Sequence, residues 1–355
     1  MLRRDFLKLS VAGSSMIAME QFVPRFLGKT AAQTPGANQT GGRDTILVII
    51  QLTGGNDGLN TIVPYRDDLY YKNRPTLGIK QKEALKFTDT LGLHPRLTGL
   101  RQLHEKGHLA AVLGVGYPNP DRSHFESMDV WQAADPTRRL SSGWLARATA
   151  TLPTRKGVPA MFLGADKIPL ALQGSAGGVV SIERPQDFGL ALRDPNEKRR
   201  QLRRTLIEDL SRDTPNEALA AFVQKRQLQA LQSSDKIREI LKDTTTGVAQ
   251  VSDSRNLDEK LNLVASLIRA DFGTRIYYVA LDGFDTHSGQ AEAHANLLGT
   301  MSEAVSRFFE TLQSSELAQR VLLLTYSEFG RRVKENASAG TDHGAGSCLF
   351  VVGSG

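Results

Sequence analysis

The sequence predicts an α/β protein built on a doubly wound, mostly parallel sheet. Six short apolar runs recur along the chain, each the length of one strand, and helical patterns lie between several of them. Such alternation is typical of a parallel sheet with helices on both faces. The first run, residues 45–52, is almost continuously apolar, as expected of a central strand covered on both sides.

The other five predicted strands are residues 109–115, 158–163, 275–281, 321–325 and 347–352. The predicted helices include residues 97–107, 257–271 and 290–314. Residues 193–245 differ from the rest, because they carry many charges of both signs and no strand pattern. We interpret this segment as a helical insertion beside the sheet.

The N-terminus has the features of a twin-arginine export signal. Residues 3–8 read RRDFLK, a moderately apolar stretch follows over 9–19, and small residues arrive at Ala31 and Ala32. The apolar stretch is shorter than the roughly 20 residues that span a bilayer. We therefore expect residues 1–32 to be a removable signal, read by the twin-arginine translocase. A retained membrane anchor is the alternative.

This reading places the protein in the periplasm or outside the cell. Residues 33–42 are then a linker, and residues 43–355 are the α/β domain, with no stable membrane span. The net charge is +6, of which residues 1–32 supply +3 (five basic minus two acidic side chains). The remaining charge of about +3 is too mild to predict a nucleic-acid partner.

The chain has one cysteine, Cys348, so it forms no internal disulfide. Cys348 precedes an apolar run, which favours a buried core thiol over a reactive one. No spacing of Cys and His typical of a zinc finger occurs.

Polar residues follow several predicted strands, where ligands bind in open α/β sheets. After the first strand comes Asp57, preceded by two glycines that permit tight turns. An aspartate there is placed like a metal ligand or a helix cap. The Gly-Gly-Asn-Asp-Gly run alone does not decide between these roles, because such runs are common in turns.

Ser123 and His124 follow the second strand and precede an apparent helix over 125–133. Ser123 therefore lies near a helix N-terminus, where backbone N–H groups stabilise developing negative charge, which suits a nucleophile. The position also suits an N-cap serine, with Glu126 completing a capping box. The local sequence favours the cap.

Asp285 and His287 follow the fourth strand. Their alternate spacing in an extended loop directs both side chains to the same side, where they are able to share a metal ion. A histidine hydrogen-bonded to a nearby aspartate is the common alternative. His294 lies in the next predicted helix, either as a second ligand or on its polar face, and we favour the polar face.

Asp342 and His343, flanked by glycine, give the most specific local signal in the chain. Their oxygen and nitrogen ligands suit zinc or manganese. Arg331 and Arg332, after the fifth strand, are candidates for binding an anion, and surface arginines are the alternative.

Five separated runs together resemble the bacterial domain of unknown function 1501 family, whose members typically carry twin-arginine signals. These runs are residues 51–60 (QLTGGNDGLN), 114–127 (GVGYPNPDRSHFES), 283–287 (GFDTH), 327–331 (SEFGR) and 341–347 (TDHGAGS). The resemblance covers nearly the whole chain after the signal. The family is in turn similar to the alkaline phosphatase and sulfatase superfamily, which implies an alkaline phosphatase-like fold.

That similarity implies two-metal phosphoryl or sulfuryl transfer. The implied nucleophile is Ser123, with Arg331 stabilising charge. The implied metal ligands are Asp57, Asp285, His287, Asp342 and His343. The implied cofactor is a divalent metal, zinc or manganese, with calcium as a further candidate.

The sequence also departs from the superfamily pattern. Asp285 and His287 are two residues apart, where many members space this pair four apart, and many use a further C-terminal histidine. Family members continue beyond the position of Gly355, so we expect the domain to have a further strand and ligand there.

Two hypotheses follow. The first is an exported metal-dependent hydrolase that acts on a phosphate or sulfate ester of a small molecule or glycan. The second is a non-catalytic periplasmic or surface binding protein on the same fold, favoured by the altered Asp-x-His spacing. A dinucleotide- or ATP-binding protein is disfavoured, because no glycine-rich phosphate motif follows the first strand.

Overall fold

A computed structural model describes residues 45–353, with internal gaps. The gaps are residues 153–157, 165–166, 176–177, 183–195 and most of 211–255, where only residues 220, 221, 224, 228, 232–237, 239 and 240 are described. The predicted export signal and linker therefore lie outside the described residues.

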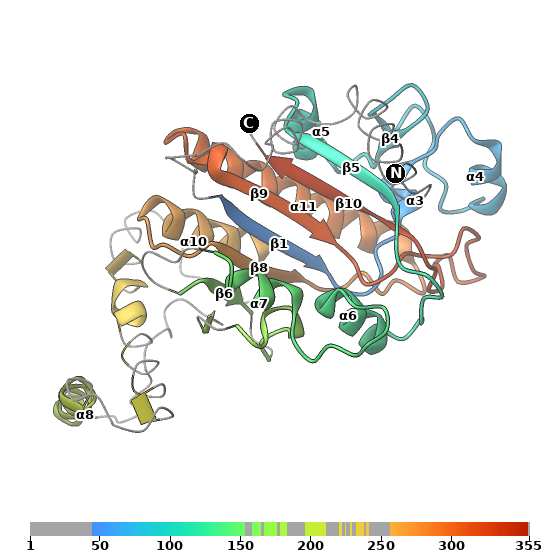
Figure 1. The fold of residues 1–355 in the computed structure, drawn as a ribbon. Helices are drawn as coiled ribbons and strands as arrows, with labels where there is room; N and C mark the ends of the chain where they lie inside the picture. Colours follow the sequence, from blue (N-terminus) through green and yellow to red (C-terminus); the bar gives the residue numbers. More distant parts are fainter. Residues whose placement is uncertain are drawn as a thin grey trace, which may run out of the picture.

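The core is a seven-stranded sheet in the order β5-β10-β9-β1-β8-β6-β7 (Figure 1). Its strands are β1 (Ile46–Leu52), β5 (Leu109–Val115), β6 (Ala160–Leu163), β7 (Val179–Ile182), β8 (Ile276–Leu281), β9 (Val321–Tyr326) and β10 (Ser347–Gly353). The pairs β1–β8, β1–β9, β6–β8 and β6–β7 are parallel. The mostly parallel α/β fold predicted from sequence is confirmed.

One strand runs against the others, because β10 pairs antiparallel with both β9 and β5. The segment between β9 and β10 therefore leaves and re-enters the sheet at one edge, the edge where the parallel strands end. This reversal brings the 327–346 loop beside the loops that follow β1 and β8.

All six predicted strands are present within a few residues of their expected bounds. β7 was not predicted, since it is a four-residue edge strand whose side chains range from exposed to buried. A separate three-stranded sheet, β2 (Ile62–Val63), β4 (Gly92–Leu93) and β3 (Leu85–Lys86), was also not predicted, because two-residue strands leave no periodic pattern.

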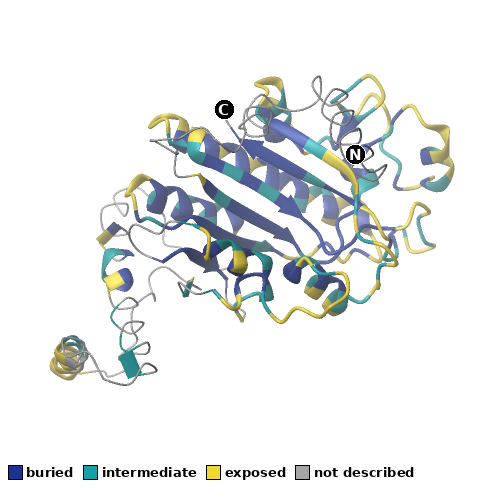
Figure 2. Cartoon of the chain, in the orientation of Figure 1, coloured by how far each residue is buried: buried dark blue, intermediate teal, exposed yellow. Residues whose placement is uncertain are grey.

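Helices cover both faces of the main sheet. On one face lie α5 (Thr98–Glu105), α10 (Leu257–Arg269) and α11 (Gln290–Gln313), whose apolar side chains join Val48, Ile50 and Leu52 of β1 in the larger core cluster. On the other face lie α6 (His124–Ala133), α7 (Trp144–Thr149) and the short 3-10 helix η1 (Leu170–Leu172), around Ile49. Figures 1 and 2 show the central strands buried between these layers.

Two short helices follow the loop after β1, α3 (Gly58–Thr61) and α4 (Asp68–Asn73), and the 3-10 helix η3 (Leu317–Arg320) precedes β9. In the charged segment, α8 spans Glu197–Leu210, which agrees with the predicted helical insertion. Arg204 on α8 forms an ion pair with Asp235, and Ile237 is fully buried in the larger core cluster. The rest of this insertion lies mostly outside the described residues.

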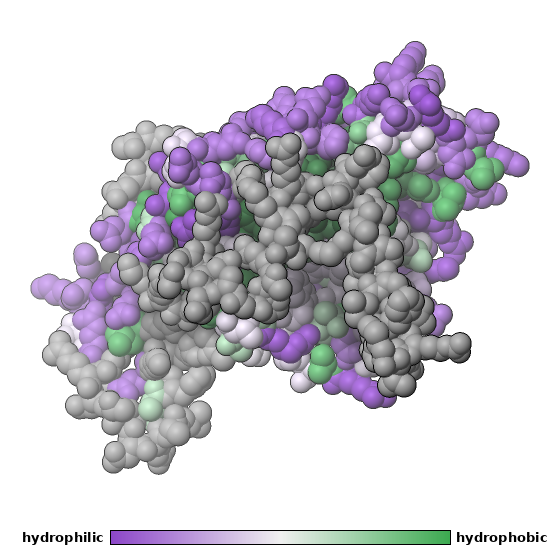
Figure 3. Space-filling view, turned by 45° about the horizontal axis from the view of Figure 1, so that its top comes forward, coloured by the Kyte–Doolittle hydropathy of each residue, from purple (hydrophilic) through white to green (hydrophobic). Residues whose placement is uncertain are grey.

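On the face shown in Figure 3, the coloured residues are mostly hydrophilic, with small hydrophobic areas between them. Among the described residues, no helix is both long and apolar enough to cross a membrane.

Candidate functional site

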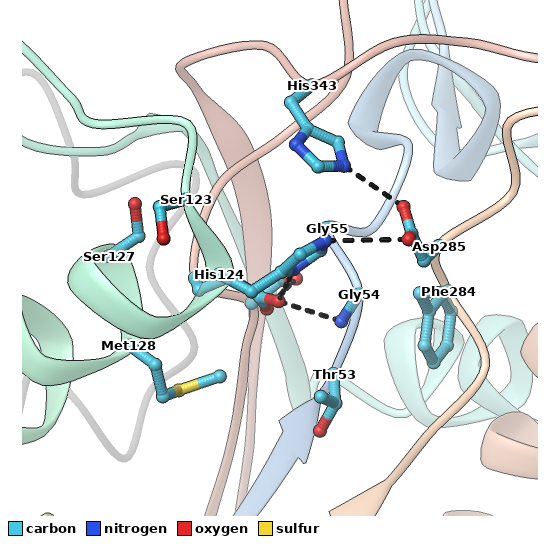
Figure 4. Close-up of polar contacts among 12 residues, drawn as sticks. Thr53, Gly54, Gly55, Ser123, His124, Ser127, Met128, Phe284, Asp285 and His343 are labelled. Atoms are coloured by element: carbon cyan, nitrogen blue, oxygen red, sulfur yellow. Dashed lines mark hydrogen bonds and ion pairs between the residues drawn. The ribbon is translucent and has the colours of Figure 1, made fainter.

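The candidate site lies where the parallel strands end. The loops after β1 and β8 meet the long segment that joins β9 to β10, and the start of α6 closes the group (Figure 4). Gly54 has a φ of +119°, and a Cβ atom there would collide with the backbone nitrogen of Asp285. Glycine therefore allows the β1 loop to approach the residue that anchors the site.

Asp285 is the centre of the site, at the end of the loop after β8. Its Oδ1 lies 2.7 Å from Nη2 of Arg331, 3.0 Å from Nε2 of His287 and 3.0 Å from Nε2 of His343. Asp285 and His287 thus point to the same side, as their spacing predicted. Burial alone would raise the pKa of the Asp285 carboxyl, but the hydrogen bond and the positive charge of Arg331 outweigh it and lower this pKa to about 2.

The two histidines of this group also face each other, with 3.0 Å between their Nε2 atoms. Nδ1 of His343 lies 2.8 Å from the carbonyl oxygen of Arg122, which accepts only, so Nδ1 carries the proton. In the neutral ring, Nε2 of His343 then presents a lone pair toward the Asp285 carboxylate. No hydrogen lies between these two acceptors.

His124, the first residue of α6, approaches from the opposite side. Its Nδ1 lies 2.8 Å from Oε1 of Glu328, and its Nε2 lies 3.5 Å from Oδ2 of Asp285. His124 Nε2 is buried and has no hydrogen-bond partner. In Figure 4, the rings of His124 and His343 both point toward Asp285.

These residues fit a divalent metal ion. His124, Asp285 and His343 each offer a ligand atom, and the three atoms lie within 4.8 Å of one another. Donor atoms around a tetrahedral zinc ion lie about 3.3 Å apart, given zinc–ligand distances of about 2.0 Å. The 3.0 Å spacings among Asp285, His287 and His343 are close to that value. A cation would also satisfy the partnerless Nε2 of His124.

Other residues contact the candidate ligands and orient their side chains, as is common for metal ligands. Glu328, fully buried, accepts hydrogen bonds from Gly54 N–H at 2.8 Å and from His124. Asp342 Oδ1 lies 3.6 Å from Nδ1 of His287. The hydrogen bond from Asn336 is the main cause that lowers the pKa of the Asp342 carboxyl. Asp342 therefore lies behind His287 rather than among the convergent donor atoms.

Asp57 was expected to be a metal ligand, but its carboxylate is turned to another partner. It is fully buried and binds the guanidinium of Arg74, with 2.6 Å between Oδ2 and Nη1. It also accepts from Gln290. Burial favours a higher pKa for Asp57, and the contacts with Arg74 outweigh this and lower it. The structure therefore brings Asp57 into a buried ion pair and not into the cluster around Asp285.

Arg331 was expected to stabilise charge on a substrate, but its guanidinium is fully buried. Its N–H groups donate to the carbonyl oxygens of Gly54, Gly55, Phe284 and Thr341 and to Asp285. With its donors used in this way, Arg331 holds the loops together and orients Asp285. Arg332 is half exposed and lies 3.9 Å from Asp342.

Ser123 occupies the N-cap position of α6, but its side chain makes no capping hydrogen bond. The capping box is therefore not formed, and Glu126 instead pairs with Arg138. The Ser123 side chain lies on the far side of the His124 ring from Asp285 in Figure 4. Its hydroxyl is next to the cluster in sequence but does not point into it.

Two other expectations concern buried residues. His294 is 2 % exposed and its Nε2 lies 2.9 Å from Oδ1 of Asn56, so the prediction of a polar helix face at this position is wrong. Cys348 is buried as expected, and burial raises the pKa of its thiol to about 12.

Sequence reasoning missed the roles of His124 and Glu328. His124 stands beside Ser123 in the run that was singled out, and Glu328 follows a predicted strand, so both had a positional signal. Neither belongs to a short motif with its partners: 204 residues separate them in the chain.

Residues 44–355 match the family described as protein of unknown function (DUF1501), and the chain belongs to this family. No curated protein matches.

Several solved structures are similar at low identity. The C-terminal periplasmic domain of EcEptC from Escherichia coli, in complex with zinc, is 9 % identical with a TM-score of 0.38, over 88 % of this chain and 74 % of that one. An alkaline phosphatase superfamily protein from Vibrio parahaemolyticus is also 9 % identical, with a TM-score of 0.38, over 88 % and 60 %. The lipoteichoic acid synthase LtaP from Listeria monocytogenes is 9 % identical with a TM-score of 0.36, over 93 % and 71 %. Likeness at this level says nothing about this chain's chemistry.

Proposed function

We propose that this member of the DUF1501 family is an exported, metal-dependent hydrolase of phosphate or sulfate esters. One observation carries the proposal: the nitrogen atoms of three histidines converge on the carboxylate of Asp285 without hydrogens to satisfy them all. The side chains of Asp285 and His287 are nearly half exposed, at 46 % each, which leaves the group open to a substrate.

Asp285, His287, His343 and His124 are the residues that would hold a divalent metal. Zinc or manganese suits this mixture of nitrogen and oxygen ligands, and calcium, which prefers oxygen, suits it less. When bound, such an ion supplies positive charge that stabilises the oxygens of a phosphoryl or sulfuryl group during displacement.

Neighbouring residues of the chain would fix the protonation and the orientation of these ligands. Glu328 holds the proton on Nδ1 of His124, and the Arg122 carbonyl holds the proton on Nδ1 of His343. Both rings then present Nε2 to the centre. Arg331 keeps the Asp285 carboxylate ionised and oriented.

Ser123 is our candidate nucleophile. Its hydroxyl makes no capping bond, and it lies at the N-terminus of α6, where backbone N–H groups favour negative charge. Attack would form a bond from Ser123 Oγ to phosphorus or sulfur and break the bond from that atom to the alcohol oxygen, which takes up the proton that Ser123 loses. Water would then hydrolyse the seryl ester, release phosphate or sulfate and restore the Ser123 hydroxyl. A turn of the Ser123 side chain toward Asp285 would have to precede that step, given its position in Figure 4.

A non-catalytic binding protein on the same fold is the second candidate. It is favoured by the use of Asp57 and Arg331 in buried contacts, which removes an expected second-metal ligand and an expected anion-binding group.

The test is elemental analysis of the purified mature protein after dialysis with zinc, manganese or calcium. We expect about one ion per chain, lost in Asp285→Ala and His343→Ala and retained in Glu105→Ala, which removes an exposed carboxylate that pairs with Arg101 at the end of α5. Metal-loaded protein would then be screened with phosphate and sulfate monoesters. The absence of any bound metal would reject the metal-dependent hydrolase. Bound metal without turnover on any ester would favour the binding protein.

Export is proposed from residues 1–32, with the small molecule or glycan ester met in the periplasm or outside the cell. Fusion of residues 1–42 to a reporter that folds before transport tests this. Replacement of Arg3 and Arg4 by lysine should abolish export of the reporter if the twin-arginine translocase reads the signal. Unchanged export would contradict this route.

A further inference from the structure

A cavity of about 250 Å³ lies beside the candidate site, between α6, α7 and the end of β9. Its walls include the rings of Tyr117, Trp131, Trp144 and Tyr326 and the side chain of Leu324. Trp131 and Trp144 are the only tryptophans in the chain, and both line this one cavity.

The walls are preorganised and apolar. The rings of Trp131 and Tyr326 stack, with centroids 5.3 Å apart and 23° between their planes. The Tyr326 hydroxyl is engaged with Tyr278, so the tyrosine presents its ring and not a free polar group. An apolar cavity of about 150 Å³ accommodates benzene, so this cavity has room for one or two rings.

The described lining of the cavity offers no positive charge to an anion. Asp135 is the one ionised side chain among the described lining residues. Hydrogen bonds from Thr137, the first of them from its side chain, lower the pKa of Asp135 to about 2, which keeps a negative charge at the rim. A phosphate or sulfate group would therefore find no cationic partner among the described lining residues, whereas an uncharged apolar ring needs none.

The cavity and the candidate site share two elements. Helix α6 begins with His124 and carries Trp131 about 10 Å further along its axis, at 1.5 Å per residue. Strand β9 ends at Tyr326, two residues before Glu328, which binds His124. The Tyr117 hydroxyl lies 2.9 Å from Oγ of Ser127 and accepts from Asp121 N–H, so one wall also orders the loop that carries Ser123.

We propose that this cavity is a subsite for the uncharged, apolar ring of the alcohol that the ester contains. The inference rests on the proposed function, which places the reacting phosphate or sulfate group at His124, about 10 Å along α6 from Trp131 of the cavity. It narrows the substrate class to phosphate or sulfate esters of ring-bearing, apolar alcohols, in preference to esters of short or highly polar alcohols.

The test uses the two tryptophans as reporters, in metal-free protein that has been treated with a chelator. Titration with phenol and with cyclohexanol, excited at a wavelength selective for tryptophan, should give a saturable change in emission. Inorganic phosphate should give none. Leu324→Phe, which fills part of the cavity, should weaken binding at least tenfold, whereas Leu322→Phe should not. Leu322 precedes Leu324 on the same face of β9, is also half-buried and does not line the cavity.

If Leu324→Phe unfolds, Trp144→Ala provides a second variant, with the remaining Trp131 as reporter and the same expected loss. The absence of saturable phenol binding in the parent protein, or equal binding by Leu324→Phe and Leu322→Phe, would overturn the proposal. This titration needs neither metal nor turnover, so its failure is distinguishable from failure of the metal analysis. With metal-loaded enzyme, KM for 5-phenylpentyl phosphate, whose ring reaches about 10 Å from the phosphorus, should be at least tenfold below KM for pentyl phosphate, and Leu324→Phe should remove that difference.

Discussion

The guanidinium of Arg331 and the carboxylate of Asp285 form an ion pair, 2.7 Å apart. The Arg331 side chain is fully buried, whereas the Asp285 side chain is 46 % exposed. The buried partner binds four backbone carbonyl oxygens as well, from loops after β1, β8 and β9. The exposed partner faces three histidines. The Arg331–Asp285 contact therefore links the buried arginine that connects the three loops to the carboxylate that faces the histidines.

Arg331→Lys should destabilise the metal-free protein by about 2–4 kcal/mol, because a lysine keeps the charge but leaves several buried carbonyl groups without donors. Urea unfolding measures this loss. Arg332→Lys, whose side chain is 52 % exposed, is the matched control and should change stability by less than about 0.5 kcal/mol. Equal stability of the two variants would mean that Arg331 does not hold these loops.

Asp57→Asn should mainly reduce the stability of the fold, whereas Asp285→Asn should mainly reduce metal binding. Loss of the Asp57 charge leaves Arg74 buried without its partner, so unfolding should become easier by about 3–5 kcal/mol while metal stoichiometry stays unchanged. Asp285→Asn should abolish metal binding at a smaller cost in stability. Metal loss in a folded Asp57→Asn protein would restore the original assignment of Asp57 as a ligand.

Glu328→Gln should weaken metal binding by about 10- to 100-fold without removing a ligand, because the amide no longer fixes the proton on Nδ1 of His124 by charge. Calorimetric titration with zinc measures the affinity. Nitrogen chemical shifts of His124 report the tautomer directly, and they should move in this variant. Glu292→Gln, an exposed glutamate in the first turn of α11, serves as the control. An unshifted tautomer with unchanged affinity would rule out the positioning role.

Ser123→Ala should leave the free energy of unfolding within about 0.5 kcal/mol of the parent, because the hydroxyl makes no capping bond. Its expected effect is on ester hydrolysis, which should fall by at least 100-fold if Ser123 is the nucleophile. Ser127→Ala should show the reverse pattern: its hydroxyl is fully buried and bonds Asp121 and Tyr117, so stability should fall by about 1–3 kcal/mol. Full activity in a folded Ser123→Ala protein would remove Ser123 from the mechanism.

Acid should destabilise the fold through two buried histidines. Burial is the main cause that lowers the pKa of His94 to about 3 and of His294 to about 4, against about 6.5 for an unfolded chain. Between pH 6.5 and 4, both histidines bind protons in the unfolded state but stay neutral in the folded state. The free energy of unfolding therefore falls as the pH falls. The loss should be about 1.4 kcal/mol per pH unit for each histidine.

Urea unfolding at pH 7, 6 and 5 measures this slope. His294→Gln, which retains a polar partner for Asn56, should reduce the slope by about half, whereas His104→Gln on α5 should leave it unchanged. A slope that is independent of both buried histidines would show that other groups govern acid sensitivity.

The strands were predictable because each apolar run is a local pattern that ends at its own turn. The reversed direction of β10 was not predictable, since strand direction depends on pairing with β9 and β5 and not on the residues of β10 themselves. Because β10 runs in the reverse direction, the loop before it places His343 at the end of the sheet where β1, β8 and β9 end.

The sequence by itself determined which residue types stand at the strand ends, and it marked Asp285, His287 and His343 as candidate ligands. Only the structure shows that their donor atoms lie 3.0 Å from one another. The tertiary structure decided the partners. Asp57 follows a strand as closely as the other candidates do, but Arg74 lies within 2.6 Å and neutralises it in the interior. Glu328 and His124 meet across 204 residues of chain. Local patterns report burial and turns, whereas the contact between two ionisable groups depends on how the whole sheet brings their loops together.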